Sequence, residues 1–137
     1  MNAMRMEKGF KGAGELTNEV TVREADVMRF VREDKDFRGK AGSLAAPRFV
    51  CVYLGVDGDG LNDGNGGEAV LADGAQIGTV SSIAWGHGVN RLLAFAYVAP
   101  EHSAPGTALH VVVMGEARAA EVLAEPVYDP GNEKPRS

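Results

Sequence analysis

The chain has 137 residues, a hydrophobic fraction of 45%, a charged fraction of 24% and a formal net charge of −5. These values are typical of one folded globular domain and argue against intrinsic disorder. An acidic chain is a poor candidate for binding the phosphate backbone of nucleic acids, and no apolar run approaches the roughly 18 residues that a membrane-spanning helix needs.

Residues 1–46 carry an irregular pattern with two short helical signals. Thr21 and Glu24 form the pattern of a capping box, in which each side chain accepts a bond from the other residue's backbone N–H. This pattern predicts a helix over Thr21–Val31, and a second short helix is expected over Asp36–Ala45. Two such brief helices cannot bury a core of their own. We therefore interpret this segment as the C-terminal remnant of a domain whose body lies elsewhere.

From residue 47 to residue 137, short apolar runs alternate with Gly, Asp and Pro, as expected for an all-β domain. Asp73-Gly74 and Met114-Gly115 have the composition of tight hairpin turns, since Gly readily adopts a positive φ. Closure into a barrel would hide the strand edges that an isolated sheet exposes. We predict a mainly β fold, a six-stranded antiparallel Greek-key barrel over residues 47–137. The predicted strands are Phe49–Val56, Glu68–Ala72, Ala75–Trp85, Leu92–Val98, Ala108–Met114 and Ala117–Glu125.

Residues 116–125 carry two conflicting signals. Their Ala, Glu, Leu and Arg content favours a helix by intrinsic propensity. They also alternate, with Ala120 and Val122 on one side and Glu121 on the other, as in a half-buried strand. The short connection through Gly115 favours a hairpin, so we predict a strand.

Residues 57–68 resemble a calcium-binding loop only in part. Counted from Asp57, acids stand at positions 1, 3, 7 and 12, but Leu61 occupies position 5 and the turn glycine is at position 8. An EF-hand loop needs an oxygen ligand at position 5 and a glycine at position 6, between two helices. The flanking runs are strands, so we favour a solvated acidic loop and predict no metal site. The three histidines also lack metal-ligand spacing with Cys51.

Other candidate reactive groups receive structural interpretations. Ser81 and Ser82 lie in a predicted strand and lack the G-x-S-x-G pattern of a nucleophile elbow. Cys51 is the one cysteine, which excludes an internal disulfide and fits a reducing compartment. The start, Met1–Arg5, has no apolar signal-peptide core. We therefore predict no catalytic residue among these and expect a cytoplasmic location.

Six phrases, in order, resemble the glycine cleavage T-protein (aminomethyltransferase) family. The opening phrase, Met4–Phe10 followed by Gly14–Thr21, is most similar to the folate domain of dimethylglycine and sarcosine dehydrogenases. The family's pattern is not kept at Val22, at Asp26 and over Lys40–Leu44. The other five matching phrases are Asp34–Lys40, Gly78–Gly86 with His87, Leu93–Val98, Pro100–Thr107 and Glu125–Pro130.

The resemblance implies the C-terminal part of a tetrahydrofolate-dependent enzyme that transfers a one-carbon unit from an amine donor, in glycine cleavage or methylglycine oxidation. This part would wall the folate site, with an upstream folate-binding domain as its partner, and would be inactive alone without tightly bound cofactor. Glu7 falls on the family's pterin-binding glutamate, and a carboxylate can accept two parallel N–H bonds. Arg32 falls where a cationic residue faces the folate.

Two further hypotheses remain open at this stage. The chain could be a non-catalytic β-barrel interaction module that lacks the catalytic half. A homo-oligomer is a second partner hypothesis, because an unpacked apolar face favours self-association. The identity of the one-carbon donor, whether a lipoyl-bound aminomethyl group, dimethylglycine or sarcosine, is not specified by the sequence.

Overall fold

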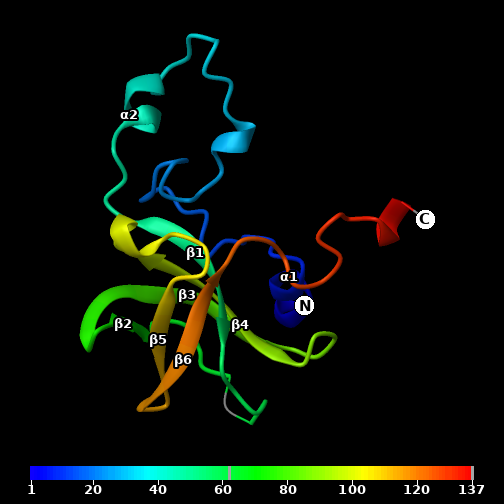
Figure 1. Ribbon diagram of the computed structural model, residues 1–137. Coiled ribbons are helices and arrows are strands. Elements are labelled where there is room, and N and C mark those ends of the chain that lie inside the picture. The colour runs from blue at the N-terminus through cyan, green and yellow to red at the C-terminus, as the bar shows by residue number, and fades with distance from the viewer. Residues whose placement is uncertain (62, 137) are drawn as a thin grey trace.

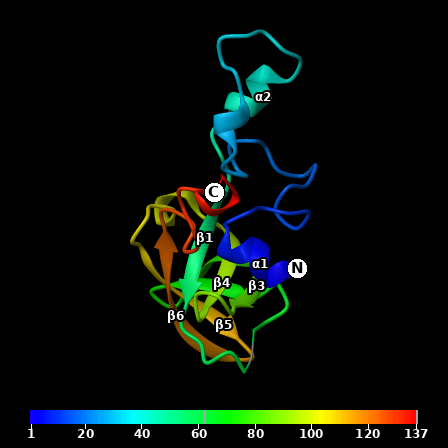
Figure 2. The same cartoon turned by 90° about the vertical axis from the view of Figure 1, so that its right-hand side faces the viewer.

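The computed structural model describes residues 1–61 and 63–136, and its main body is a closed β-barrel (Figures 1 and 2). The strands are β1 (Val50–Val56), β2 (Ala69–Ala72), β3 (Ala75–Gly86), β4 (Arg91–Val98), β5 (Ala108–Val113) and β6 (Glu116–Leu123). Their order around the barrel is β1-β4-β3-β2-β5-β6, and every pair is antiparallel. Because the β2-β3-β4 meander ends with β4 beside β1, the first strand, the connectivity is a Greek key. The predicted mainly β, six-stranded barrel is confirmed.

Two tight turns set the register of two of the hairpins. Asp73 and Gly74 have φ values of 50° and 79°, and Met114 and Gly115 have values of 51° and 81°. Positive φ at both central residues is the type I′ geometry, whose twist matches that of the flanking strands. The second turn brings β6 back along β5, where it forms a ladder from Val113 opposite Glu116 onward. Pairing and burial therefore outweigh the helix propensity of this segment.

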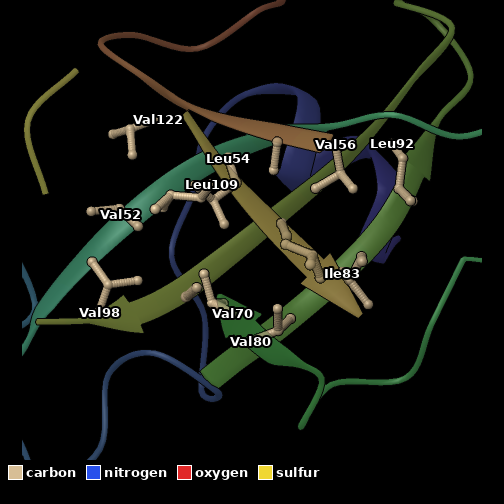
Figure 3. Packing of buried hydrophobic residues seen from close by; sticks show 14 of the residues in the cluster. Val52, Leu54, Val56, Val70, Val80, Ile83, Leu92, Val98, Leu109 and Val122 are labelled. Atoms are coloured by element: carbon tan, nitrogen blue, oxygen red, sulfur yellow. The ribbon is translucent and has the colours of Figure 1, made fainter. Parts of the chain in front are cut away.

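The inside of the barrel is filled by alternate residues of the strands (Figure 3). In β5, for example, Leu109 and Val111 are buried while His110 between them is exposed. The buried residues of this inner cluster are Val52, Leu54, Val56, Val70, Val80, Ile83, Leu92, Ala94, Ala96, Val98, Leu109, Val111, Val113, Ala120 and Val122. The barrel thus has an apolar core of its own.

A second apolar cluster lies outside the barrel, under the helix α1 (Asn2–Glu7). Met6 of this helix packs on the outward-facing Leu93 and Phe95 of β4, and all three are at most 1% exposed. The β4 run is therefore apolar on both faces because one face fills the barrel and the other supports α1. The N-terminal segment is in this way joined to the barrel by a shared apolar layer.

The predicted helix over Thr21–Val31 is wrong, although its capping box forms. Thr21 N donates to Glu24 Oε2 at 2.9 Å, and Glu24 N donates to Thr21 Oγ1 at 3.1 Å. Asp26 then adopts a left-handed φ of 54°, which takes the backbone off the right-handed helical path. Only the 3₁₀ turn η1 (Met28–Phe30) follows. The capping box here stabilises a turn.

The remaining helices are short. The helix expected over Asp36–Ala45 is reduced to α2 (Lys40–Leu44), and α1 was not predicted. The 3₁₀ turns η2 (Pro100–His102) and η3 (Lys134–Arg136) complete the list of elements. No helix within residues 1–61 and 63–136 is long and apolar enough to cross a membrane.

Candidate functional site

Glu7 is the last residue of α1, and its carboxylate lies against the turn between β3 and β4. Glu7 Oε1 accepts a hydrogen bond from Gly88 N at 2.5 Å, and the residue is 9% exposed. A Cβ atom added at Gly88 would lie 3.0 Å from Glu7 Oε2, so a glycine permits this close approach. Within the described part of the chain, no donor bonds to Oε2. One carboxylate oxygen of Glu7 is thus fixed by the barrel, and the other keeps its accepting capacity.

The C-terminal tail after β6 (residues 124–136) and strand β1 also bind the end of α1. Tyr128 N donates to Glu7 O at 3.1 Å, and Tyr53 Oη donates to Met6 O at 2.7 Å. Lys8 Nζ lies 2.9 Å from Asp129 Oδ2, and these two side chains are only 18% and 6% exposed. Such a sheltered ion pair is screened less by salt than a surface pair. The backbone around Glu7 is therefore fixed by both the barrel and the tail.

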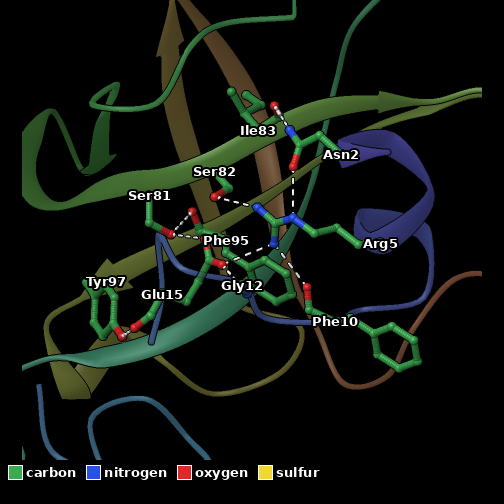
Figure 4. A network of polar contacts seen from close by, with 10 residues as sticks. All are labelled: Asn2, Arg5, Phe10, Gly12, Glu15, Ser81, Ser82, Ile83, Phe95 and Tyr97. Carbon is green, nitrogen blue, oxygen red and sulfur yellow. Dashed lines mark hydrogen bonds and ion pairs between the residues drawn. The ribbon is translucent and has the colours of Figure 1, made fainter. Parts of the chain in front are cut away.

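A polar network ties the N-terminal segment to the outer face of β3 and β4 (Figure 4). Arg5 Nη1 lies 3.1 Å from Glu15 Oε2, and Arg5 Nη2 donates to Ser82 Oγ at 2.8 Å. The fully buried Glu15 side chain also accepts from Ser81 Oγ at 2.8 Å, and Tyr97 Oη donates to Glu15 O at 2.5 Å. Both serine hydroxyls are engaged in this network, which supports their structural interpretation.

Glu15 is ionised in spite of its burial. Burial alone would raise the pKa of Glu15, but hydrogen bonds from Ser82, from a backbone N–H and from Ser81, together with the charge of Arg5, hold that pKa below its ordinary value. A buried carboxylate with this many donors is stable as the anion. The network is thus a charged anchor between Arg5 and the barrel.

Glu24 fastens together two points that are distant in sequence. Arg48 Nε donates to Glu24 Oε1 at 2.8 Å, Arg48 N donates to the same oxygen at 3.0 Å, and Cys51 N donates to Glu24 O at 2.7 Å. The hydrogen bond from the Arg48 side chain, followed by that from Thr21 N, lowers the pKa of Glu24 to about 2. Residues 25–47, here called the arm, leave the barrel and return to it at this point (Figures 1 and 2).

Arg32, the second predicted folate-binding residue, lies in the arm. It pairs with Asp34 at a Nη2–Oδ2 distance of 2.5 Å, and the two side chains are 67% and 62% exposed. The arm projects away from α1 and the barrel in both views (Figures 1 and 2). Within the described chain, none of the contacts of Arg32 involves Glu7. The structure therefore does not bring the two predicted residues together.

A cleft of about 850 Å³ opens between the loop that follows α1 (residues 8–20, here called the N-terminal loop), the base of the arm, β1 and the tail. Its cationic lining residues are Lys8, Lys11 and Arg29, and Lys11 Nζ lies 3.2 Å from Asp26 Oδ2. Its aliphatic and aromatic lining residues from the N-terminal loop and the arm are Phe10, Leu16, Val27 and Phe30. Glu7 and Arg32 do not line this cleft. It combines apolar contact surface with charges of both signs.

The acidic loop over residues 57–68 does not gather metal ligands where it is described. Both oxygens of Glu68 accept backbone bonds from Asn65 or Gly66, and Asp59 Oδ1 accepts from Leu61 N. No group of three His, Cys, Asp or Glu side chains within residues 1–61 and 63–136 could hold a metal ion. Asn62 lies outside the described residues. Asp59 and Glu68 therefore cap turns of this loop, whereas Asp63 Oδ2 accepts from Trp85 N of β3 at 3.3 Å.

Cys51 is a packing residue of β1. It is 2% exposed, and burial raises the pKa of its thiol to about 12. Because the thiolate is the reactive form, such a cysteine is inert at neutral pH.

Residues 48–129 match the family described as the glycine cleavage T-protein C-terminal barrel domain. The chain belongs to this family. It is 38% identical over 133 residues to an aminomethyltransferase of Saccharopolyspora erythraea, a match that covers 93% of this chain and 36% of that protein. It is 32% identical over 136 residues to the mitochondrial dimethylglycine dehydrogenase of Rattus norvegicus, covering 93% of this chain and 16% of the relative.

A solved structure supports the fold of the chain. The glycine cleavage system aminomethyltransferase T of Bartonella henselae superposes with a TM-score of 0.83 at 21% identity. The superposition covers 94% of this chain and 38% of that protein. The chain therefore spans little more than a third of the length of these aminomethyltransferases.

Sequence reasoning missed two features that shape the site. Glu15 has no local motif, and its partners Ser81 and Tyr97 are distant in sequence, so only the fold could reveal the network. The capping-box pattern did single out Glu24, but it could not indicate a bond to Arg48. No local signal marks Glu15, whose neighbourhood also holds Lys11, Thr17 and Asn18.

Proposed function

We propose that this chain forms the barrel side of a tetrahydrofolate site in a protein that transfers a one-carbon unit from an amine donor to tetrahydrofolate. Membership of the family carries this proposal, together with relatives named aminomethyltransferase and dimethylglycine dehydrogenase. Such transfer depends on holding the folate nitrogen beside the carbon donor while a carboxylate tunes protonation. The group that does so would come from an upstream folate-binding domain, and the site would be cytoplasmic.

Glu7 is the proposed contact with the pterin ring. Each carboxylate oxygen has two lone pairs, so the bond from Gly88 leaves room for N–H donors of an aminopyrimidine edge. The barrel and the tail fix its backbone, which lowers the entropy lost when a ligand binds. Arg32 is the proposed cationic group toward the folate, with a weaker effect because its side chain is 67% exposed.

Glu7→Gln tests this role in a full-length context. In a chimera where this chain replaces the matched region of the Saccharopolyspora erythraea relative, we expect the Kd for tetrahydrofolate to rise roughly tenfold or more, since a charge-assisted bond contributes about 1.5–3 kcal/mol. The amide oxygen can still accept from Gly88 N, so the Tm should not change. Titration calorimetry and thermal unfolding measure the two quantities.

The matched control is Glu121→Gln, which removes a charge from a side chain that is 51% exposed on β6 and pairs with Arg91. It should leave the Kd unchanged. Equal affinities for the chimera and its Glu7→Gln variant would refute the assignment of Glu7. A similar loss in both variants would point to a general effect of charge.

The second candidate is a non-catalytic β-barrel interaction module, for which the closed barrel with its own buried apolar core provides a self-contained scaffold. Calorimetry on the 137-residue chain alone distinguishes a self-sufficient folate site from a wall that needs a partner domain. We expect no tight binding of tetrahydrofolate by the isolated chain. A sub-micromolar Kd would show that the wall role is wrong.

A further inference from the structure

We propose that Arg5 is a positioning residue for Glu7, because the contacts of its side chain fix the rotation of α1 about the helix axis and thereby the direction of the Glu7 carboxylate. This inference rests on the proposed function, which assigns Glu7 to the pterin ring. It goes beyond that function by naming a residue that acts on ligand affinity only through Glu7.

Three consecutive residues at the end of α1 contact different parts of the barrel. Met6 is fully buried in the outer apolar cluster. Arg5 before it contacts Ser82 of β3, and Glu7 after it contacts Gly88 in the β3–β4 turn. Successive residues of an α-helix are separated by roughly 100° around the axis, so Arg5 and Glu7 lie on the two sides of Met6.

The apolar contact through Met6 holds α1 on the barrel but does not by itself fix its rotation. Apolar burial is non-directional and depends mainly on the area removed from water. The helix has only six residues, so a turn of some degrees about its axis would keep most of this burial. Hydrogen bonds weaken steeply as their angle departs from linear. The polar contacts on the two sides of Met6 therefore determine the rotation.

On one side, the guanidinium of Arg5 is held by several acceptors in one plane (Figure 4). The acceptors are Asn2 Oδ1 at 2.9 Å, Phe10 O at 3.0 Å, Glu15 Oε2 at 3.1 Å and Ser82 Oγ at 2.8 Å. They come from α1 itself, from the N-terminal loop and from β3. A planar guanidinium with this many acceptors has one orientation, whereas an ammonium group would not keep the same set.

On the other side, the seat of Glu7 is narrow. A Cβ atom added at Gly86 would lie 3.0 Å from Glu7 Cγ, and one added at Gly88 would lie 3.0 Å from Glu7 Oε2. The side chain of Glu7 thus approaches the backbone at both glycines closely, and its bond to Gly88 N is short, at 2.5 Å. A rotation of α1 that follows loss of the Arg5 contacts would weaken this bond and redirect Oε2, the oxygen that keeps its accepting capacity.

Arg5→Lys tests the inference in the 137-residue chain without any ligand. Lysine keeps a positive charge beside Glu15 but loses the planar set of bonds. Gly88 is exposed and its N–H donates to Glu7, so loss of this bond opens the amide to water. We expect the Gly88 amide to exchange at least about tenfold faster in Arg5→Lys, as NMR-detected hydrogen exchange would measure, while the amides of β5 keep their protection. Arg38→Lys is the matched control, because Arg38 is exposed and lies in the arm.

Ser82→Ala and Glu7→Gln, alone and together in the full-length chimera, connect this rotation with ligand affinity. Ser82→Ala should raise the Kd for tetrahydrofolate about threefold or more, within the range for residues that act on a site without touching the ligand. Added to Glu7→Gln, it should raise the Kd by less than about twofold, because the contact that it misdirects is already lost. Ser82→Thr keeps the hydroxyl and should restore the Kd. Ser103→Ala is the matched control, because the Ser103 hydroxyl donates within its own turn, to Pro100 O at 2.7 Å.

Unchanged exchange of the Gly88 amide in Arg5→Lys would overturn the inference, because the direction of Glu7 would then not depend on Arg5. Equal effects of Ser82→Ala on the Kd with and without Glu7→Gln would also overturn it, since the loss would then not pass through Glu7. If Arg5→Lys does not fold, Ser82→Ala replaces it in the exchange measurement, with the same faster exchange expected at Gly88.

The two measurements separate this inference from the proposed function. An unchanged Kd in Glu7→Gln together with faster Gly88 exchange in Arg5→Lys would refute the pterin contact and still support control of Glu7 by Arg5. A raised Kd in Glu7→Gln together with unchanged exchange would do the reverse.

Discussion

Phe95→Ala is expected to lower the free energy of unfolding by about 3–5 kcal/mol, the range for truncating a buried aromatic ring. Phe95 is 1% exposed, and its ring centroid lies 5.2 Å from that of Tyr53. Both belong to the outer cluster that supports Met6. Removing the ring would leave a cavity between α1 and the barrel, because the inner core and the strand ladders prevent collapse into that space. Urea unfolding followed by circular dichroism measures the loss.

The same variant reports on how α1 is attached. We expect the α1 amides of Phe95→Ala to exchange faster, while those of β5 keep the protection of the inner core. Phe49→Ala is the control, since Phe49 is 47% exposed and its truncation should change stability by no more than about 0.5 kcal/mol. If Phe95→Ala behaved like this control, the outer cluster would not be what holds α1 on the barrel.

The barrel could be predicted from sequence because its information is local. Asp73-Gly74 and Met114-Gly115 specify type I′ turns, and the alternation of β5 places Leu109 and Val111 inside. A turn of fixed geometry together with one buried face leaves a single register. Even the helix-prone residues of β6 follow, since the preceding turn presents them to the edge of β5.

The region before the barrel could not be predicted in the same way because its contacts are distant in sequence. The capping box at Thr21 gave a correct local bond and a wrong helix, since Asp26 turns left-handed and Glu24 is shared with Arg48. Likewise, Glu7 was singled out by the resemblance alone. Its bond to Gly88 spans 81 positions, and no periodicity in the sequence encodes such a pair.

Glu24→Gln is expected to lower the free energy of unfolding at pH 7 by about 2 kcal/mol. The pKa of Glu24 falls from its ordinary value of 4.5 to about 2 in the folded chain. At 1.36 kcal/mol for each pKa unit, this shift corresponds to about 3 kcal/mol. The Arg48 side chain is 65% exposed, so solvent screening reduces the contribution. The amide keeps the shape of the carboxylate but loses its charge and one acceptor.

The sign of the pH dependence follows from this lowered pKa. Above pH 4.5 the carboxylate is ionised in both folded and unfolded chains, and its full stabilisation is present. As the pH falls from 4.5 toward 2, the unfolded chain binds the proton first, so the stabilisation is progressively lost. The stability difference between the wild type and Glu24→Gln should therefore shrink over this window, as urea unfolding at a series of pH values would measure. Glu15 titrates in both proteins and cancels in the difference. If the stability difference between the wild type and Glu24→Gln stayed constant from pH 7 to pH 3, the charge of Glu24 would not be what fastens the arm. The shape of the side chain and its neutral hydrogen bonds would then suffice.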